Sequence, residues 1–182
     1  MISSLQSVSR KSLTIIGLGN EYLTDDGLGV RVVRDLKKRL DADEAKFEEL
    51  SIGGIQLLDY LAAAEECIIV DAIVSGSRPA GTLYRFIQSA EREDVHITSS
   101  HQIDLSQVLA FGKLMGAQLP KRLTVYGIEA DDVTTFNDGC STQVMNAIPK
   151  LVNLICKDIE NSEHSPSSSD GEWQILHEIV TN

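Results

Sequence analysis

Apolar residues form short, nearly continuous runs along this chain. The clearest runs are rich in β-branched side chains and cover residues 12–18, 67–73 and 123–130. Such runs are typical of strands that are buried on both faces, as in a parallel sheet. Residues 81–86 instead alternate polar and apolar positions after the turn-forming sequence SGSRPAG, which predicts a strand with one exposed face. We expect this strand to be the antiparallel member of the sheet.

Segments with apolar residues at helical spacing lie between or after these runs. They span residues 27–40, 51–64, 101–116 and 141–159. In the first segment Val30, Val33 and Leu36 fall on one face and basic residues on another, which predicts an amphipathic helix. The second segment begins as a loop before its helix. In the last segment Pro149 predicts a kink.

Strands that alternate with helices predict a single-domain, three-layer α/β/α sandwich with a twisted, mostly parallel sheet. The chain has 182 residues, 42% of them hydrophobic, which is enough for one domain with a substantial core. We assign this domain to residues 12–159 and a flexible lead to residues 1–11. Residues 160–182 are polar and rich in Ser, which predicts a disordered tail with a short element after Trp173.

The charge and the apolar runs restrict the classes of partner. The formal net charge is -11, which argues against nonspecific binding to nucleic acid or to an anionic membrane. No apolar run approaches the roughly 18 residues that a membrane span needs, and the first run is too short for a secretory signal. We therefore expect a cytoplasmic protein that binds neither nucleic acid nor membrane.

The cysteines Cys67, Cys140 and Cys156 are odd in number and widely spaced. This pattern predicts reduced thiols and argues against a disulfide framework or a zinc site. Cys67 begins a predicted strand, Cys156 lies on a predicted helix, and Cys140 has no histidine near it in the sequence. The sequence therefore argues against a cysteine nucleophile, and it also lacks the H-E-x-x-H motif of a catalytic zinc site.

The sequence GLGNEYLTDDGLGVRVV places a glycine turn between the first predicted strand and the first predicted helix. Gly17 and Gly19 allow the backbone to approach its neighbours closely, and Asn20 suits the turn itself. A turn of this kind between a strand and a helix commonly binds phosphate.

Acidic residues in this turn argue against phosphate. Glu21, Asp25 and Asp26 would repel an anion, and Tyr22 stands where a dinucleotide-binding turn has its third glycine. The chain also lacks the Gly-Lys-Ser/Thr of a phosphate loop and the G-x-S-x-G of an α/β-hydrolase. The turn therefore favours a positively charged guest.

Three polar residues are expected at the carboxyl ends of the predicted strands, where open α/β sheets bind ligands. Asp26 follows the first strand, Asp71 ends the run IIVD, and His101 opens a helix. Each also has a purely structural explanation. Asp26 would be an acid at a helix N-terminus, worth about 0.3–1 kcal/mol, Asp71 would cap the loop after its strand, and His101 would be an ordinary residue at the start of a helix. Together they form an incomplete metal shell with room for water or substrate. A buried aspartate is costly unless it is paired or coordinated, which favours the metal site.

Three segments of the chain together resemble the hydrogenase maturation endopeptidases, which process the large subunit of nickel-iron hydrogenases. They are the glycine-turn sequence, IIVDAIVSGSRPAGTLYRF, and SSHQIDLSQVLAF followed by LPKRLTVYGIEA. The resemblance runs from about residue 13 to residue 155. It implies one α/β domain that removes a short C-terminal extension from a large-subunit precursor after nickel has been inserted. It also implies metal-binding roles for Asp26, Asp71 and His101.

One segment departs from the family. Many members have an Asp-Gly-rich sequence before the second helix, where this chain reads EELSIGGIQLL, with Ser51 and Ile52 in the middle. Glu49 is the nearest acid. This chain therefore lacks the aspartate that those members carry in this segment.

The resemblance and the residues suggest metal-assisted hydrolysis in which the substrate supplies the nickel. We expect Asp26, Asp71 and His101 to contact that nickel and so to test whether the precursor is loaded. Asp25 would activate water, orient the motif, or only support Asp26. Nickel would serve recognition together with Lewis-acid catalysis, or recognition alone.

Two alternatives belong to other classes of protein. A noncatalytic nickel-sensing or escort module would use the same ligands and leave the precursor uncut, and a Rossmann-type enzyme would need the turn to accept pyrophosphate. We expect a monomer, because the chain must dock a large partner. Substrate specificity is expected in the loops at residues 75–81 and 134–139.

Overall fold

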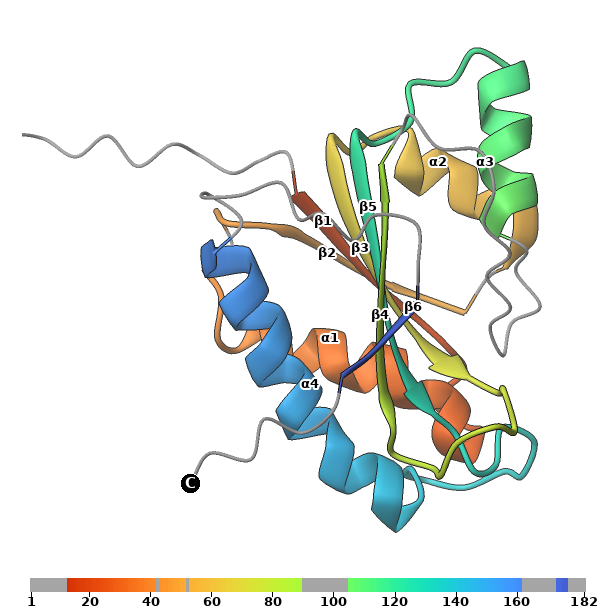
Figure 1. Ribbon diagram of the computed structural model, residues 1–182, viewed down its shortest axis with the longest axis vertical. Helices are drawn as coiled ribbons and strands as arrows, with labels where there is room; N and C mark the ends of the chain where they lie inside the picture. The colour runs from red at the N-terminus through yellow and green to blue at the C-terminus, as the bar shows by residue number, and fades with distance from the viewer. Residues whose placement is uncertain (1–12, 42, 52, 90–104, 162–172, 177–182) are drawn as a thin grey trace, which may run out of the picture.

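The strands of the computed structural model form one six-stranded sheet (Figure 1). Residues 13–41, 43–51, 53–89, 105–161 and 173–176 are described. The strands are β1 (Leu13–Leu18), β2 (Lys46–Leu50), β3 (Glu66–Ile73), β4 (Leu83–Ser89), β5 (Arg122–Glu129) and β6 (Trp173–Leu176). The α-helices are α1 (Leu28–Lys37), α2 (Leu57–Leu61), α3 (Leu105–Leu114) and α4 (Thr142–Asn161). Two short 3-10 helices, η1 (Thr24–Gly27) and η2 (Gly54–Gln56), precede α1 and α2.

The sheet order is β2-β1-β3-β5-β4-β6. β2, β1, β3 and β5 are parallel to one another, whereas β4 is antiparallel to both β5 and β6. The predicted antiparallel strand is thus confirmed. Because β1, β3 and β5 run in one direction, their carboxyl ends lie at the same edge of the sheet.

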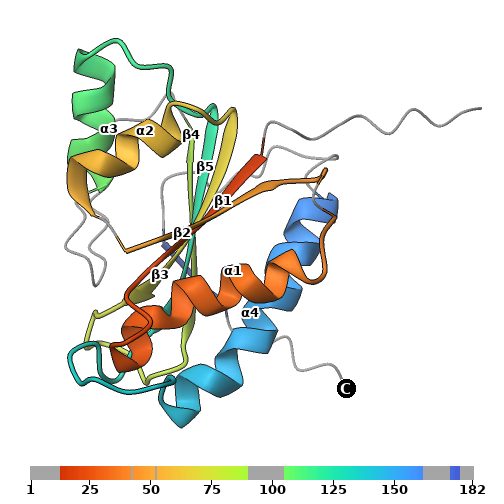
Figure 2. The same ribbon diagram turned by 180° about the vertical axis from the view of Figure 1, so that it is seen from behind.

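Helices cover both faces of the sheet, with α1 and α4 on one face and α2 and α3 on the other (Figures 1 and 2). Alternate residues of each strand supply the two cores. In β3, for example, Ile68 and Val70 pack in the core beneath α1 and α4, whereas Cys67 and Ile69 pack beneath α2 and α3. The predicted three-layer α/β/α sandwich is confirmed.

The amphipathic face predicted for the first helix is buried in the structure. Val30, Val33 and Leu36 are fully or almost fully buried, and Leu40 packs partly against the same core. The helix itself is shorter than the expected span of residues 27–40, since α1 begins at Leu28 and ends at Lys37. Asp25 and Asp26 lie just before it, in η1. Pro149 lies inside α4, which continues on both sides of it.

Two strands were not expected as such. β2 was missed, and β6 forms within residues 160–182, which we had assigned to a disordered tail. The short element expected after Trp173 is therefore a strand that pairs with β4. Among the described helices, none is long and apolar enough to cross a membrane.

Candidate functional site

The glycine turn after β1 is held tightly by backbone packing. Gly19 has a φ of 142°, and a Cβ atom at this position would lie 1.9 Å from the carbonyl oxygen of Asp26. A Cβ on Gly17 would lie 2.4 Å from the carbonyl oxygen of Gly29 at the start of α1. Only glycine fits at these two positions, so the turn brings the start of α1 against the end of β1.

Asn20 and Asp26 close the turn through hydrogen bonds. The backbone N–H of Asn20 donates to Oδ2 of Asp26 at 2.8 Å. The side-chain Oδ1 of Asn20 accepts from the N–H of Tyr22 at 3.1 Å, an Asx turn. The sequence analysis assigned turn chemistry to Asn20, and these contacts are of that kind. Asp26 is buried, and the turn fixes its side chain.

Asp25 is fully buried and accepts four hydrogen bonds from one loop. Its Oδ2 accepts from the N–H groups of Asp131 and Asp132, at 2.8 and 3.1 Å, and from the Ser141 hydroxyl at 3.0 Å. Its Oδ1 accepts from the N–H of Ser141 at 2.6 Å. The backbone N–H of Asp25 also donates to the carbonyl oxygen of Asp132 at 2.8 Å. Asp25 therefore ties η1 to both ends of the loop between β5 and α4.

Asp71 is buried near the carboxyl end of β3. By the alternation of the strand it faces the side of the sheet that carries α2 and α3. Its Oδ1 accepts a hydrogen bond from the N–H of Ala72 at 2.7 Å. Gly17 pairs with Val70, so the chain enters the glycine turn directly beside Asp71.

The structure brings two of the three predicted metal ligands to one edge of the sheet. η1, which carries Asp26, packs against β3, which carries Asp71. His101 lies outside the described residues. Within the described part of the chain, no three His, Cys, Asp or Glu side chains are grouped so that they could hold a metal ion. The two carboxylates supply oxygen donors and leave the remaining ligand positions to other groups.

Glu21 differs from the other acids of the turn, since it pairs with a cation at the surface. Arg34 on α1 contacts Glu21 at 2.6 Å and Glu49 on β2 at 2.9 Å. The Arg34 guanidinium lowers the pKa of Glu21 through its hydrogen bond and its charge. Glu21 and Glu49 therefore tie α1 to its neighbours, and they are not part of a common cluster with Asp25 and Asp26.

Ser51, at the position where the sequence departs from the family, contacts the glycine turn. Its hydroxyl donates to the carbonyl oxygen of Gly19 at 2.9 Å, and the N–H of Gly19 donates to the carbonyl oxygen of Leu50 at 3.0 Å. This segment therefore supports the turn from the β2 side. Ile52 lies outside the described residues.

Glu129, at the carboxyl end of β5, is a buried carboxylate that the sequence analysis did not single out. Its Oε1 accepts from the N–H groups of Ser75 and Gly76, at 3.0 and 2.8 Å. Its Oε2 accepts from the hydroxyls of Ser75 and Tyr84, at 2.8 and 2.7 Å. The only signal in the sequence was an acidic residue at the end of an apolar run, in the same position relative to its strand as Asp71.

The cysteines are poorly suited to be nucleophiles. Burial raises the pKa of the Cys140 thiol to about 11 and raises the pKa values of Cys67 and Cys156 as well. Thiolates at neutral pH are therefore rare at all three positions. This agrees with the argument from sequence against a cysteine protease.

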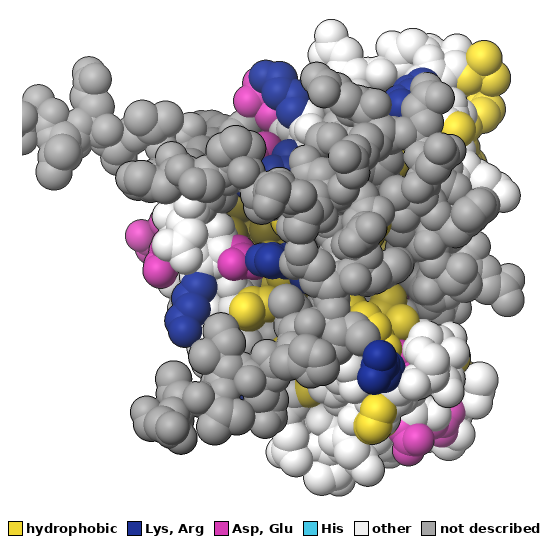
Figure 3. Space-filling view, in the orientation of Figure 1, with side chains coloured by type: hydrophobic (Ala, Val, Ile, Leu, Met, Phe, Trp, Pro, Cys, Tyr) yellow, Lys and Arg dark blue, Asp and Glu magenta, His cyan; other side chains and the backbone are white. Residues whose placement is uncertain are grey.

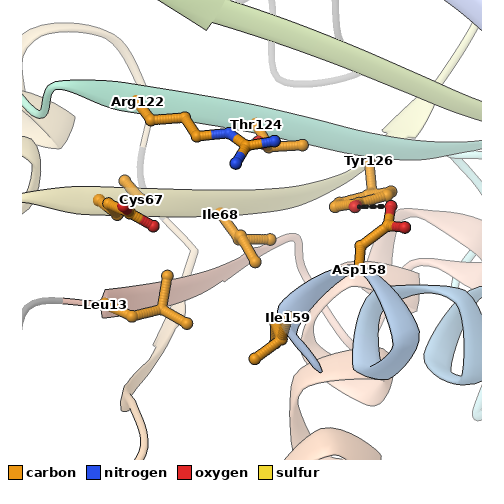
Figure 4. A pocket seen from close by; sticks show the side chains of 9 residues that line it. Leu13, Cys67, Ile68, Arg122, Thr124, Tyr126, Asp158 and Ile159 are labelled. Atoms are coloured by element: carbon orange, nitrogen blue, oxygen red, sulfur yellow. Dashed lines mark hydrogen bonds between the residues drawn. The ribbon is translucent and has the colours of Figure 1, made fainter. Parts of the chain in front are cut away.

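A small pocket lies at the opposite end of the strands (Figure 4). There the Tyr126 hydroxyl donates to Asp158 at 2.5 Å, and Arg85 contacts the same carboxylate oxygen at 2.7 Å. These contacts join α4 to the sheet. The pocket is lined by residues of β1, β3 and β5, mostly from their amino-terminal halves, and by Asp158 and Ile159 of α4. It is separate from the edge that carries Asp26 and Asp71.

On the face seen in Figure 3, the visible Lys and Arg side chains of the described residues are scattered, and some of them lie beside Asp or Glu side chains. Among the ion pairs of the described residues, Arg34 lies between Glu21 and Glu49, and Lys46 contacts Glu48 at 2.9 Å.

Comparison with known proteins identifies relatives over most of the chain. The family model described as hydrogenase maturation protease matches residues 30–158. The hydrogenase 2 maturation protease of Escherichia coli K12 is 34% identical over 120 residues, which cover 64% of this chain and 71% of that protein. The hydrogenase expression/formation protein HoxM of Azotobacter vinelandii is 30% identical over 169 residues, covering 91% of this chain and 80% of that protein.

A solved structure is similar in fold and sequence. The hydrogenase maturating endopeptidase HybD from E. coli superimposes with a TM-score of 0.70 and 28% identity, covering 82% of this chain and 93% of that structure.

Proposed function

The chain belongs to the hydrogenase maturation protease family and is an endopeptidase, and on that premise we propose that it cleaves the precursor of a nickel-iron hydrogenase large subunit. The bond that it hydrolyses releases a C-terminal extension, and it does so after nickel has been inserted. The protein acts as a monomer in the cytoplasm.

The observation that carries this proposal is the pair of buried carboxylates at one sheet edge. Asp26 and Asp71 lie on segments that pack against each other, and both are almost fully buried. Burying two carboxylates is costly unless a cation or hydrogen-bond donors compensate. A metal ion brought by the substrate would compensate both at once.

In this proposal nickel belongs to the substrate. Asp26, Asp71 and His101 contact the nickel of the loaded precursor, and a precursor without nickel lacks the cation that these groups need. Two carboxylates and one imidazole leave coordination positions for the ligands of the precursor itself. Nickel then serves recognition, and it polarises the scissile carbonyl if that group reaches the ion.

Of the roles expected for Asp25, its hydrogen bonds support the orienting one. Both carboxylate oxygens are occupied by donors from the loop between β5 and α4. A general base needs a free lone pair directed at the attacking water. Asp25 therefore holds Asp26 and the loop in place, and water activation falls to another group.

The test is the intact mass of a large-subunit precursor, nickel-loaded and nickel-free, before and after incubation with the protein. We expect the loaded precursor alone to lose its C-terminal peptide. We also expect Asp26→Asn to abolish this loss, because it removes the negative charge that faces the nickel.

The matched control is Asp43→Asn, a change of the same kind at an exposed residue before β2, at the other end of the sheet. It should process the loaded precursor at the wild-type rate. Normal cleavage by a folded Asp26→Asn variant would refute the role of Asp26. Nickel-dependent binding without any loss of mass would instead identify a nickel-sensing or escort protein.

A further inference from the structure

Glu129 holds a loop beside the proposed site, and the proposed function gives this residue no role. The loop runs from residue 74 to residue 82, between β3 and β4, and begins three residues after Asp71. We propose that this loop binds the C-terminal extension of the precursor and that Glu129 is its positioning residue. The inference rests on the proposed function and names the surface that recognises the substrate.

Glu129 fixes the loop at both ends. Its side chain accepts hydrogen bonds from Ser75 and Gly76 at the first end. Its backbone carbonyl accepts from the N–H of Gly81, and its N–H donates to the carbonyl oxygen of Thr82, both at 2.8 Å. One residue of β5 thus closes the loop against the sheet. A loop held in this way is ordered before a substrate arrives.

The conformation of the loop is built around this carboxylate. Gly76 has a φ of 63°, a value that suits glycine and directs its N–H toward Oε1 of Glu129. The Ser75 hydroxyl lies between Glu129 and Ser77, at 2.8 Å from an oxygen of each. Removing the carboxylate would leave two backbone N–H groups without their acceptor.

The loop displays an apolar side chain and a cation toward solvent. Val74 is 52% exposed, although it directly follows the buried end of β3. Arg78 is exposed. Burial, the largest cause, raises the pKa of Tyr84, and the positive charge of Arg78 partly opposes this rise, so Arg78 lies near the Glu129 network. In a chain with a net charge of -11, a cation beside the proposed site is a selective feature.

These features define the chemistry of the occupant. Val74 fits an apolar side chain of the extension, and Arg78 fits a carboxylate, from either an acidic side chain or the chain terminus. The loop starts so close to Asp71 that a peptide held by it would lie next to the nickel-contacting groups. The extension is the part of the precursor that must lie there if the adjoining bond is to be cut.

The experiment compares two affinities for each variant. The KM and kcat for the nickel-loaded precursor report on a substrate that has the extension. The inhibition constant of the processed large subunit reports on the same partner without it. The variants are Glu129→Ala, Glu129→Gln and Arg78→Glu.

We expect Glu129→Ala and Arg78→Glu to raise KM about three- to tenfold with little change in kcat, because rim contacts and loop order act on binding. The inhibition constant of the processed subunit should stay within about twofold of wild type. Glu129→Gln should restore the wild-type KM, since its amide oxygen accepts from the two N–H groups and its NH2 donates to the two hydroxyls. A variant that was merely misfolded would weaken both constants together.

Arg78→Glu keeps the test valid if Glu129→Ala does not fold, because Arg78 is exposed. An unchanged KM for Arg78→Glu and Glu129→Ala, or equal losses for precursor and processed subunit, would overturn the inference while leaving the proposed function intact. If the wild-type protein cuts no precursor, the proposed function fails. In that case the equilibrium Kd of each variant is measured for the nickel-loaded precursor and for the processed subunit. Equal changes in these two Kd values again overturn the inference.

Discussion

Asp25 and Glu129 each accept four hydrogen bonds in a buried setting, yet replacing the carboxylate by an amide should destabilise the protein much more at Asp25 than at Glu129. The difference lies in the donors. Asp25 faces three backbone N–H groups and one hydroxyl, whereas Glu129 faces two backbone N–H groups and two hydroxyls. A backbone N–H can only donate, but a hydroxyl can donate or accept.

In Asp25→Asn one amide oxygen must replace two carboxylate oxygens. The better orientation places this oxygen where Oδ2 was, so that it still accepts from Asp131, Asp132 and the Ser141 hydroxyl. The new NH2 group then faces the N–H of Ser141, which was 2.6 Å from Oδ1. Two donors meet in a buried site, and each unsatisfied buried donor costs about 1–3 kcal/mol. We expect a loss of about 2–4 kcal/mol in the free energy of unfolding.

In Glu129→Gln the same exchange can satisfy every group. The amide oxygen accepts from the N–H groups of Ser75 and Gly76, and the NH2 group donates to the hydroxyls of Ser75 and Tyr84 after these rotate. The expected loss in the free energy of unfolding is below about 1 kcal/mol.

Urea unfolding of wild type and the two variants, followed by circular dichroism, measures both values. The m-values should agree among the three proteins, so that the midpoints can be compared. Equal losses for Asp25→Asn and Glu129→Gln, or a larger loss for Glu129→Gln, would refute the reasoning from donor type.

Two further predictions concern packing and the thiols. Gly29→Ala should lower the free energy of unfolding by about 1–3 kcal/mol. The reason is that a Cβ atom there would lie 2.2 Å from the carbonyl oxygen of Leu18 and 2.3 Å from that of Val70. An unchanged urea midpoint would contradict this close approach. Iodoacetamide at pH 7.5 should leave precursor processing unaffected, because a thiol such as Cys140, with a pKa near 11, is almost entirely protonated there. Its alkylation rate should rise with pH up to that value, and rapid inactivation at pH 7.5 would contradict it.

The parallel core of the sheet could be predicted because β1, β3 and β5 are buried on both faces and so read as apolar runs. β2 could not, because it is an edge strand. Its sequence is KFEEL, and only Leu50 is buried. Its pairing with β1 depends on position in the fold and leaves little trace in local hydrophobicity.

The sequence predicts those parts of the site whose position depends on where the strands end. Asp26 follows one predicted strand and Asp71 lies near the end of another, and the common direction of β1 and β3 places them at one edge. The role of Glu129 was not predictable, because it depends on a hydrogen bond from Ser75, which is 54 residues away in the sequence. Glu21 was grouped with Asp25 and Asp26 by sequence proximity, but its partner Arg34 lies on the surface of α1.

The outer edge of the sheet restricts how a polypeptide can approach this protein. Extended peptides commonly bind proteins by adding a strand to an open sheet edge. β2 forms one edge, three of its five residues are the charged Lys46, Glu48 and Glu49, and none of the described strands pairs with its outer side. Charged side chains on an edge strand discourage the addition of another strand. A polypeptide is therefore not expected to bind this protein by adding a strand to β2.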